Sequence, residues 1–182
     1  MRNLPLPIVI AALLISAQCQ AWTLKVHGCV NQYLTGLPMQ GATIKVYKNG
    51  IRLTTTTTGA TGKYSFDLEN GARYVFRFSA PGSQGKCFTV DTNGMVWEGE
   101  KGTKEVFVEM ILFKRISGMD LSYFDLPMGM ARFEPATGLV QWDREYDARI
   151  RSEVAVLMAD YERRLHELGE AGRPQALASA GR

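Results

Sequence analysis

Histidine and cysteine are scarce in this sequence, which limits the metal chemistry it can support. The 182 residues include only two histidines, His27 and His166, and three cysteines. A zinc site takes three or four well-placed ligands, and His166 lacks the H-E-x-x-H spacing that places two histidines on one helical face. His27 has Cys29 as a neighbour but nothing else to complete a site. We therefore expect no metal and no cofactor.

A cysteine nucleophile is the remaining catalytic arrangement to consider. Cys87 and His27 are conceivable as a nucleophile and its base. Beyond Lys86, however, nothing in the sequence around Cys87 indicates a lowered thiol pKa. We expect Cys87 to be structural and the chain not to be an enzyme.

Clusters of one charge sign are also missing. Lys and Arg number 21 against 18 Asp and Glu, which gives a formal net charge of +3, and the basic residues are scattered. A nucleic-acid surface needs a stripe of Lys and Arg. We expect no nucleic acid among the partners.

The N-terminal apolar run, Leu4–Ser16, is too short to span a bilayer comfortably. It follows a short basic start at Arg2 and precedes small residues that suit cleavage after Ala21. These features predict a signal peptide over residues 1–21 and an exported chain, periplasmic or extracellular, in the cell envelope.

Two other uses of this N-terminal segment stay open, an uncleaved anchor and acylation at Cys19. Gln18 fits the second poorly, because a small residue normally precedes a lipidated cysteine. We expect membrane contact only through the signal peptide or a lipidated Cys19.

The sequence does have a strong period of two from Trp22 to about Ile116, where apolar and polar residues alternate as in half-buried strands. Turn signals rich in Gly, Asn and Pro separate the alternating runs. The pattern predicts, over residues 22–116, a mainly β domain, an antiparallel β-sandwich of about seven strands. The positions assigned to its core are Leu24, Val26, Ala42, Ile44, Val46, Tyr64, Phe66, Leu68, Tyr74, Phe76, Phe78, Phe88 and Val90.

The five consecutive threonines, Thr54–Thr58, resemble low complexity, but their neighbours favour a strand. Asn49-Gly50 predicts a two-residue hairpin turn, because both central positions of a type I′ turn need positive φ. The hairpin makes Ile51–Thr58 its second strand, and β-branched threonine favours extended backbone. An O-glycosylated linker would also carry Pro and Ser.

The strand predicted at Glu105–Ile116 is apolar on both faces. One face carries Val106, Val108, Met110 and Leu112, and the other carries Phe107, Ile111 and Phe113. Such a strand must be covered on both sides. The first set belongs to the sandwich core, and another element must cover the second.

After about Asp143 the period becomes that of an amphipathic α-helix. Its apolar stripe consists of Ile150, Val154, Leu157, Tyr161, Leu165 and Leu168. Asp143 is expected to cap the start and Gly169 the end. We expect this helix to cover the second face of the Glu105–Ile116 strand, and the alternative, a stripe that faces a partner chain, stays open.

The helix belongs to a C-terminal extension, residues 117–168, that is expected to pack on the sandwich. It also contains a short hairpin around Ala136-Thr137-Gly138. Residues 169–182 have little to bury and are expected to form a disordered tail.

Cys29 and Cys87 remain after removal of the signal peptide, and an exported chain can keep a disulfide. Alternation places both off the core face, so they could pair under the C-terminal helix. Two separate structural thiols are the alternative, because pairing needs a geometry that sequence does not give.

Two further features are candidate ligand sites. Asp91–Glu100 has carboxylates around a turn, but Gly94 and Met95 break the EF-hand pattern, so a solvated hairpin loop is the simpler interpretation. Trp97 and Trp142 are candidates for stacking on a sugar, with ordinary core packing as the alternative.

Four segments follow one family pattern in order and spacing. They are V-H-G-C-V-N (Val26–Asn31), L-P-M-Q-G-A-T-I-K-V (Leu37–Val46), T-T-G-A-T-G-K-Y-S-F-D-L (Thr57–Leu68) and N-G-A-R-Y-V-F-R-F (Asn70–Phe78). The pattern resembles the carboxypeptidase regulatory-like domain, a transthyretin-like, Ig-like antiparallel β-sandwich. The aspartate of the family's turn is Gly59 in this sequence.

The rest of the chain resembles exported Gram-negative envelope proteins that carry this domain with a C-terminal extension. The resemblance implies a structural or binding module and not a peptidase, since the family's domain accompanies catalytic domains without being one.

Two functional hypotheses follow. The first is a non-catalytic secreted or periplasmic envelope module that acts as a scaffold or binds a protein partner, which we expect to be an envelope protein. The second is a carbohydrate-binding module of the cell envelope, with a glycan as its ligand. Under the first hypothesis, the candidate partner surface is the helical stripe of Ile150, Val154, Leu157, Tyr161 and Leu165, provided that these residues do not pack on their own chain.

Overall fold

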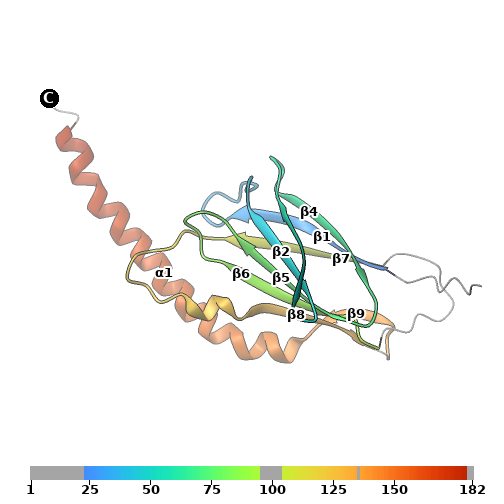
Figure 1. Cartoon of the computed structure of the whole chain (residues 1–182). Helices are drawn as coiled ribbons and strands as arrows, with labels where there is room; N and C mark the ends of the chain where they lie inside the picture. The colour runs from blue at the N-terminus through green and yellow to red at the C-terminus, as the bar shows by residue number, and fades with distance from the viewer. Residues whose placement is uncertain (1–22, 95–103, 135, 180–182) are drawn as a thin grey trace, which may run out of the picture.

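The computed structural model describes residues 23–94, 104–134 and 136–179 (Figure 1). The predicted signal peptide, Cys19 and Trp97 lie outside the described residues. None of the helices within these ranges is both long and apolar enough to cross a membrane.

Two sheets enclose one core. The three-stranded sheet has the order β4 (Lys63–Glu69), β1 (Thr23–Gln32), β7 (Lys104–Leu112), and the six-stranded sheet has the order β3 (Ile51–Thr57), β2 (Thr43–Lys48), β5 (Arg73–Ser79), β6 (Lys86–Asp91), β8 (Pro127–Glu134), β9 (Leu139–Trp142). A short 3-10 turn, η1 (Ser122–Asp125), and one long helix, α1 (Arg144–Ser179), complete the described chain. The predicted mainly β sandwich with a C-terminal helix is confirmed.

The seven strands predicted over residues 22–116 are β1 to β7, and the predicted hairpin is β8–β9. Two pairs, β1–β7 and β6–β8, are parallel and so depart from the antiparallel prediction. In each pair a long stretch of chain that includes at least one strand of the other sheet separates the two strands, so no tight hairpin forces them to be antiparallel. Periodicity fixes which side of a strand is buried but not its direction.

The predicted core positions are confirmed. All are buried except Phe66, which is partly buried against the same cluster. Phe76 and Phe88, on adjacent strands, stack with ring centres 4.7 Å apart. Val106, Val108, Met110 and Leu112 of β7 close the core from the three-stranded sheet.

The threonine run divides into an exposed strand and one buried anchor. Asn49 and Gly50 have φ of 50° and 82°, which confirms the predicted turn. Thr54–Thr57 are exposed and pair with β2. Thr58 is 5% exposed, and its hydroxyl accepts a 3.0 Å hydrogen bond from the Ala42 backbone N–H and donates one of 2.6 Å to the Met39 backbone oxygen.

At Gly28, strands β1 and β7 lie too close for any side chain. A Cβ on Gly28 would lie 1.8 Å from the backbone oxygen of Val108 and 3.1 Å from the hydroxyl of Tyr64. Tyr64 is on β4, the other neighbour of β1, and its hydroxyl donates a 2.7 Å hydrogen bond to that same Val108 oxygen. All three strands of the sheet therefore meet at a point that requires glycine.

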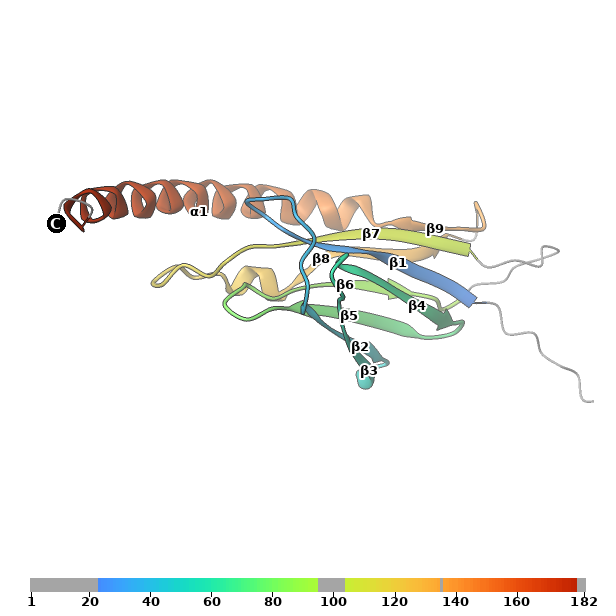
Figure 2. The same cartoon turned by 90° about the horizontal axis from the view of Figure 1, so that it is seen from above.

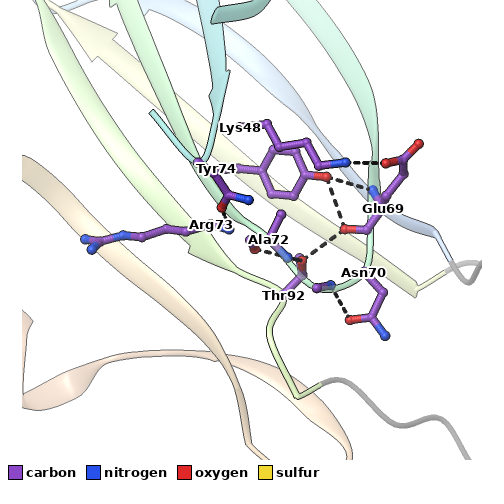
Figure 3. Close-up of polar contacts among 9 residues, drawn as sticks. Lys48, Glu69, Asn70, Ala72, Arg73, Tyr74 and Thr92 are labelled. Atoms are coloured by element: carbon purple, nitrogen blue, oxygen red, sulfur yellow. Dashed lines mark hydrogen bonds and ion pairs between the residues drawn. The ribbon is translucent and has the colours of Figure 1, made fainter. Parts of the chain in front are cut away.

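A polar cluster at one end of the sandwich joins the two sheets (Figure 3). The fully buried Thr92 hydroxyl accepts a 3.1 Å hydrogen bond from the Ala72 backbone N–H and donates one of 2.9 Å to the Glu69 backbone oxygen. The Tyr74 hydroxyl accepts a 3.1 Å bond from the Glu69 backbone N–H, and the Glu69 carboxylate pairs with Lys48. Glu69 ends β4, whereas Tyr74 belongs to β5, so the cluster fixes the relative position of the sheets.

Helix α1 begins as predicted and ends later. The Tyr146 backbone N–H donates a 2.9 Å hydrogen bond to Asp143 Oδ1, which holds the pKa of that carboxyl below its ordinary value. The predicted stop at Gly169 is wrong, because α1 continues to Ser179. The tail predicted over residues 169–182 stays a prediction. Gly169 lacks the positive φ of a helix-ending glycine, and a glycine inside a helix costs only about 1 kcal/mol. In both views the end of α1 projects beyond the sheets (Figures 1 and 2).

We expect Gly28→Ala to destabilise the chain by about 3 kcal/mol or more, because its methyl group would overlap the Val108 backbone oxygen. The measurement is denaturant unfolding, read as the change in midpoint. Gly59→Ala is the matched control, since no atom lies within 4 Å of a Cβ there, and it should change stability by less than about 1 kcal/mol. Equal midpoints for the two variants would contradict the crowded contact at Gly28.

We expect Thr58→Val to cost about 1–3 kcal/mol, because the isosteric valine leaves the Ala42 N–H and the Met39 oxygen without their partner. Thr56→Val, in the exposed part of the same run, should stay within about 0.5 kcal/mol of wild type. Similar unfolding midpoints for both valine variants would show that Thr58 is not an anchor.

Candidate functional site

Strand β3 is an exposed edge of the six-stranded sheet. Within the described residues it pairs only with β2, and all seven of its residues are exposed. Ile51 and Leu53 expose 76% and 56% of their surface. Such an edge presents unpaired backbone N–H and C=O groups to which another chain can add a strand. Figure 2 shows β3 on the side of the sandwich that faces away from α1.

The neighbouring edge, β4, is better protected against strand addition. It carries exposed Lys63, Asp67 and Glu69, and charges on an edge oppose pairing with another chain. β3 has Arg52 as its one charged residue. A register shift in its pairing with β2 leaves Leu53 as a bulge, after which Thr54–Thr57 pair regularly. The segment 54–57 is therefore a regular edge without charge.

Of the two alternatives for Cys29 and Cys87, the structure has the separate thiols, since both cysteines are free. The prediction that both lie off the core is correct, since neither belongs to the core cluster. They lie on β1 and β6, however, in different sheets, and the outer faces of a sandwich point in opposite directions. The Cys87 thiol donates a 3.4 Å hydrogen bond to the Asp125 backbone oxygen, and burial raises its pKa.

His27 and Cys87 do not form a nucleophile–base pair. His27 is on β1, with its Nε2 3.5 Å from Glu105 Oε2 and its ring edge-on to Phe107 at 5.6 Å, whereas Cys87 belongs to the other sheet. Among the described residues, no group of three or more His, Cys, Asp or Glu side chains is placed to hold a metal ion.

The apolar stripe of α1 packs on its own chain. Tyr161 is fully buried in a second cluster with Phe113, Leu121 and Phe124. The partly buried residues packed against this cluster include Val154, Leu157 and Leu165. Ile150 is also partly buried, whereas Leu168 remains 58% exposed. The stripe therefore packs at least partly on its own chain, with Tyr161 fully enclosed. A partner that contacts the partly exposed residues of the stripe stays a prediction.

The helix does not cover the second face of β7 as predicted, except at one end. It buries Phe113, but Phe107 remains 61% exposed and Ile111 39% exposed. The reason is the path of α1, which packs against β8, at the side of the sandwich, and not flat over β7.

Trp142 is partly packed and partly open. It is 36% exposed, and a Cβ on Gly129 would lie only 2.9 Å from its ring. The ring also meets Phe88 edge-on at 6.1 Å. A sugar-stacking role for Trp142 stays a prediction. Trp97 and most of Asp91–Glu100 lie outside the described residues, and the part that is seen is a turn in which Asp91 Oδ1 accepts a 2.9 Å bond from the Asn93 backbone N–H.

A groove that the sequence did not reveal lies between β7, β8 and the first turns of α1. It consists of two adjoining cavities of about 480 and 400 Å³. Their walls share Lys86, Ile111, Met128 and Asp147. Trp142 lines the smaller cavity.

Lys86 is the unusual residue of this groove. Its place on β6 gives it the same side-chain direction as the core residues Phe88 and Val90. Its Nζ lies 4.7 Å from the ring centre of Phe113 and 5.3 Å from that of Phe124. Burial lowers the pKa of its ammonium group to about 8. Alternation in K-C-F-T-V-D already placed a lysine on the core face, and that signal could have identified it.

Residues 25–94 match the family model described as the carboxypeptidase regulatory-like domain. The match runs from β1 past the end of β6 and so confirms the resemblance for this part of the chain. Strands β7 to β9 and α1 lie outside it. No curated protein matches the sequence.

Solved structures that share part of the backbone arrangement are distant. Examples are 3-chlorocatechol 1,2-dioxygenase from Rhodococcus opacus 1CP (10% identity, TM-score 0.39, 52% of this chain and 60% of that one), the dioxygenase domain of a dioxygenase–carbohydrate-binding protein fusion from Streptomyces sp. SirexAA-E (12%, 0.40, 56% and 86%) and catechol 1,2-dioxygenase from Acinetobacter radioresistens (14%, 0.42, 54% of each chain). The chain thus spans 60% of the length of the first. Likeness at this level does not bear on activity.

We expect a chain that begins at Trp22 to keep two reduced thiols when it is purified in air. Cys29 is partly exposed and should react with Ellman's reagent in the native protein, whereas the buried Cys87 should react only after denaturation. Burial raises the pKa of both thiols, and Glu109 adds to the rise at Cys29. The thiolate fraction at neutral pH is therefore small, and the Cys29 reaction should speed up as pH rises.

Cys29→Ser is the matched control and should abolish the native-state reaction while one thiol still appears in denaturant. An intact mass that shows an intramolecular disulfide in the wild-type chain would contradict the placement of the cysteines.

Proposed function

We propose that this chain is a non-catalytic module of the cell envelope that binds a protein partner, which adds an extended segment as a new strand beside β3. The observation that carries the proposal is the exposed, uncharged edge of Thr54–Thr57. Binding of this kind draws its affinity from main-chain hydrogen bonds and its specificity from side chains on alternate positions.

Both ends of β3 are fixed before any partner arrives. The Asn49-Gly50 turn fixes its start, and the buried Thr58 hydroxyl anchors the residue after its end. A strand that is already ordered loses little conformational entropy when it binds, which favours strand addition. The exposed Ile51 and Leu53 offer apolar contact next to the edge.

Export to the envelope is supported by the N-terminal sequence, in which Arg2, the apolar Leu4–Ser16 and the small residues before Trp22 follow the pattern of a signal peptide. A non-catalytic role is supported by the separation of His27 and Cys87 in different sheets.

The test is photo-crosslinking in cells with p-benzoylphenylalanine placed singly at each of positions 54 to 57, followed by mass spectrometry of the adducts. If a partner strand lies beside β3, successive probes should label successive residues of one segment of a single protein. The same probe at Ser65, exposed on the charged edge strand β4, is the matched control and should not label that segment.

A charge variant supplies a second readout. Thr55→Lys with Thr57→Lys places two positive charges on the edge and should reduce the adduct at Thr56 at least about tenfold, because charged edges oppose strand pairing. Labelling that is equal at Ser65, that is scattered over many proteins or that is unchanged in the double variant would refute binding by strand addition.

A further inference from the structure

We propose that the groove between β7, β8 and α1 binds a small amphiphile with a carboxylate head and an extended apolar body, and that the carboxylate pairs with Lys86. This site is separate from the β3 edge and does not depend on a protein partner there. Most of the groove lies outside the segment that matches the family model, because β7, β8 and α1 fall outside residues 25–94. Lys86 lies within that segment.

The charges of the larger cavity favour an anion. Lys86, Arg151 and Asp147 line the larger cavity, so cations outnumber acids there. Neither Lys86 nor Arg151 forms an ion pair or hydrogen bond within the part of the chain that the structure describes. The smaller cavity has the opposite balance, because Glu109 and Asp147 line it beside Lys86. The carboxylate of the ligand is therefore assigned to the larger cavity.

The phenol of Tyr33, a further titratable group of the larger cavity, stays neutral below strongly alkaline pH. It donates a hydrogen bond to Glu162, which raises its pKa to about 12. The positive charge in this cavity at neutral pH is therefore that of Lys86 and Arg151, set against Asp147.

The remaining wall of the groove suits an apolar body. It is formed mainly by Ile111, Phe124, Met128, Val154 and Met158. Methionine has a flexible side chain that adapts to the shape of a ligand. A cavity of about 480 Å³ lies within the range of small-molecule sites, roughly 300–1,000 Å³.

Lys86 gives the groove its specificity. A partly buried ammonium group without a counterion is unfavourable, and the rings of Phe113 and Phe124 compensate this only in part. A bound carboxylate would supply the missing negative charge. Ligand binding and protonation of Lys86 must then favour each other.

The experiment is isothermal titration calorimetry with dodecanoate below its micelle concentration, on the chain from Trp22. Dodecanol, which has the same apolar body without the charge, should bind at least about tenfold more weakly. Lys86→Met should weaken dodecanoate binding by a similar factor, whereas Lys45→Met, on the outer face of the six-stranded sheet, should not change it.

The pH dependence gives a readout that needs no variant. Dodecanoate stays ionised above neutral pH, whereas Lys86 loses its proton as pH rises through its pKa of about 8. Affinity should therefore be highest near neutral pH and fall towards pH 10, and this fall should be absent in Lys86→Met. The methionine variant should fold at least as stably as wild type, because it removes a partly buried charge that has no counterion.

Equal binding of dodecanoate and dodecanol, unchanged affinity in a folded Lys86→Met, or no binding by the wild-type chain would each overturn the proposal. If Lys86→Met does not fold, the alcohol comparison and the pH profile of the wild-type chain still decide the question. Because neither measurement involves β3, failure here leaves the proposed strand addition standing, and the reverse is also true.

Discussion

The narrower sheet of this sandwich depends on the contact of Gly28, Tyr64 and Val108. No side chain fits at Gly28, and the hydroxyl of Tyr64 bonds the backbone oxygen that approaches it. Gly28 and Tyr64 belong to the matched residues 25–94, but Val108 does not. The segment that matches the family model is therefore completed by β7, which supplies both the oxygen and the parallel partner of β1. The contact with the Val108 oxygen thus explains why Tyr64 near the start of β4 and Gly28 in β1 occur together.

Both candidate surfaces follow from the unequal width of the sheets. Three strands cannot cover six, so part of the wider sheet has no strand of the narrower sheet opposite it. On one side β3 extends without cover, and its residues are exposed on both faces. On the other side β8 is covered by α1 and its buried Tyr161. A helix fills such a gap less completely than a strand would, because its side chains do not continue the spacing of the sheet. The groove at Lys86 is the space that remains.

The features that the sequence predicts correctly are local ones. Alternation identified the core of β2 and β5, Asn49-Gly50 identified the hairpin, and Asp143 identified the helix start, because each depends on a few consecutive residues. What failed depends on the arrangement of distant segments. The side-chain direction of Cys29 and Cys87 was right, but periodicity does not say which sheet a strand joins. The predicted helix end at Gly169 is wrong because a glycine ends a helix only when it adopts a positive φ that the following residues stabilise.

The threonines of residues 54–58 and Lys86 differ in how they contribute to the stability of the fold. Thr58 has buried partners that explain it fully, and a chain without it would leave two backbone groups unpaired. Thr54–Thr57 have no such partners, yet they suit a strand, so their cost to the fold is small. Lys86 has a larger cost, because a partly buried ammonium group is held beside two aromatic rings without a counterion. An apolar side chain of similar length would be favoured by stability alone at that position. Thr58 therefore stabilises the fold, the edge threonines change its stability little, and Lys86 destabilises it. For this reason a bound ligand that pairs with Lys86 would stabilise the protein more at the groove than at the β3 edge.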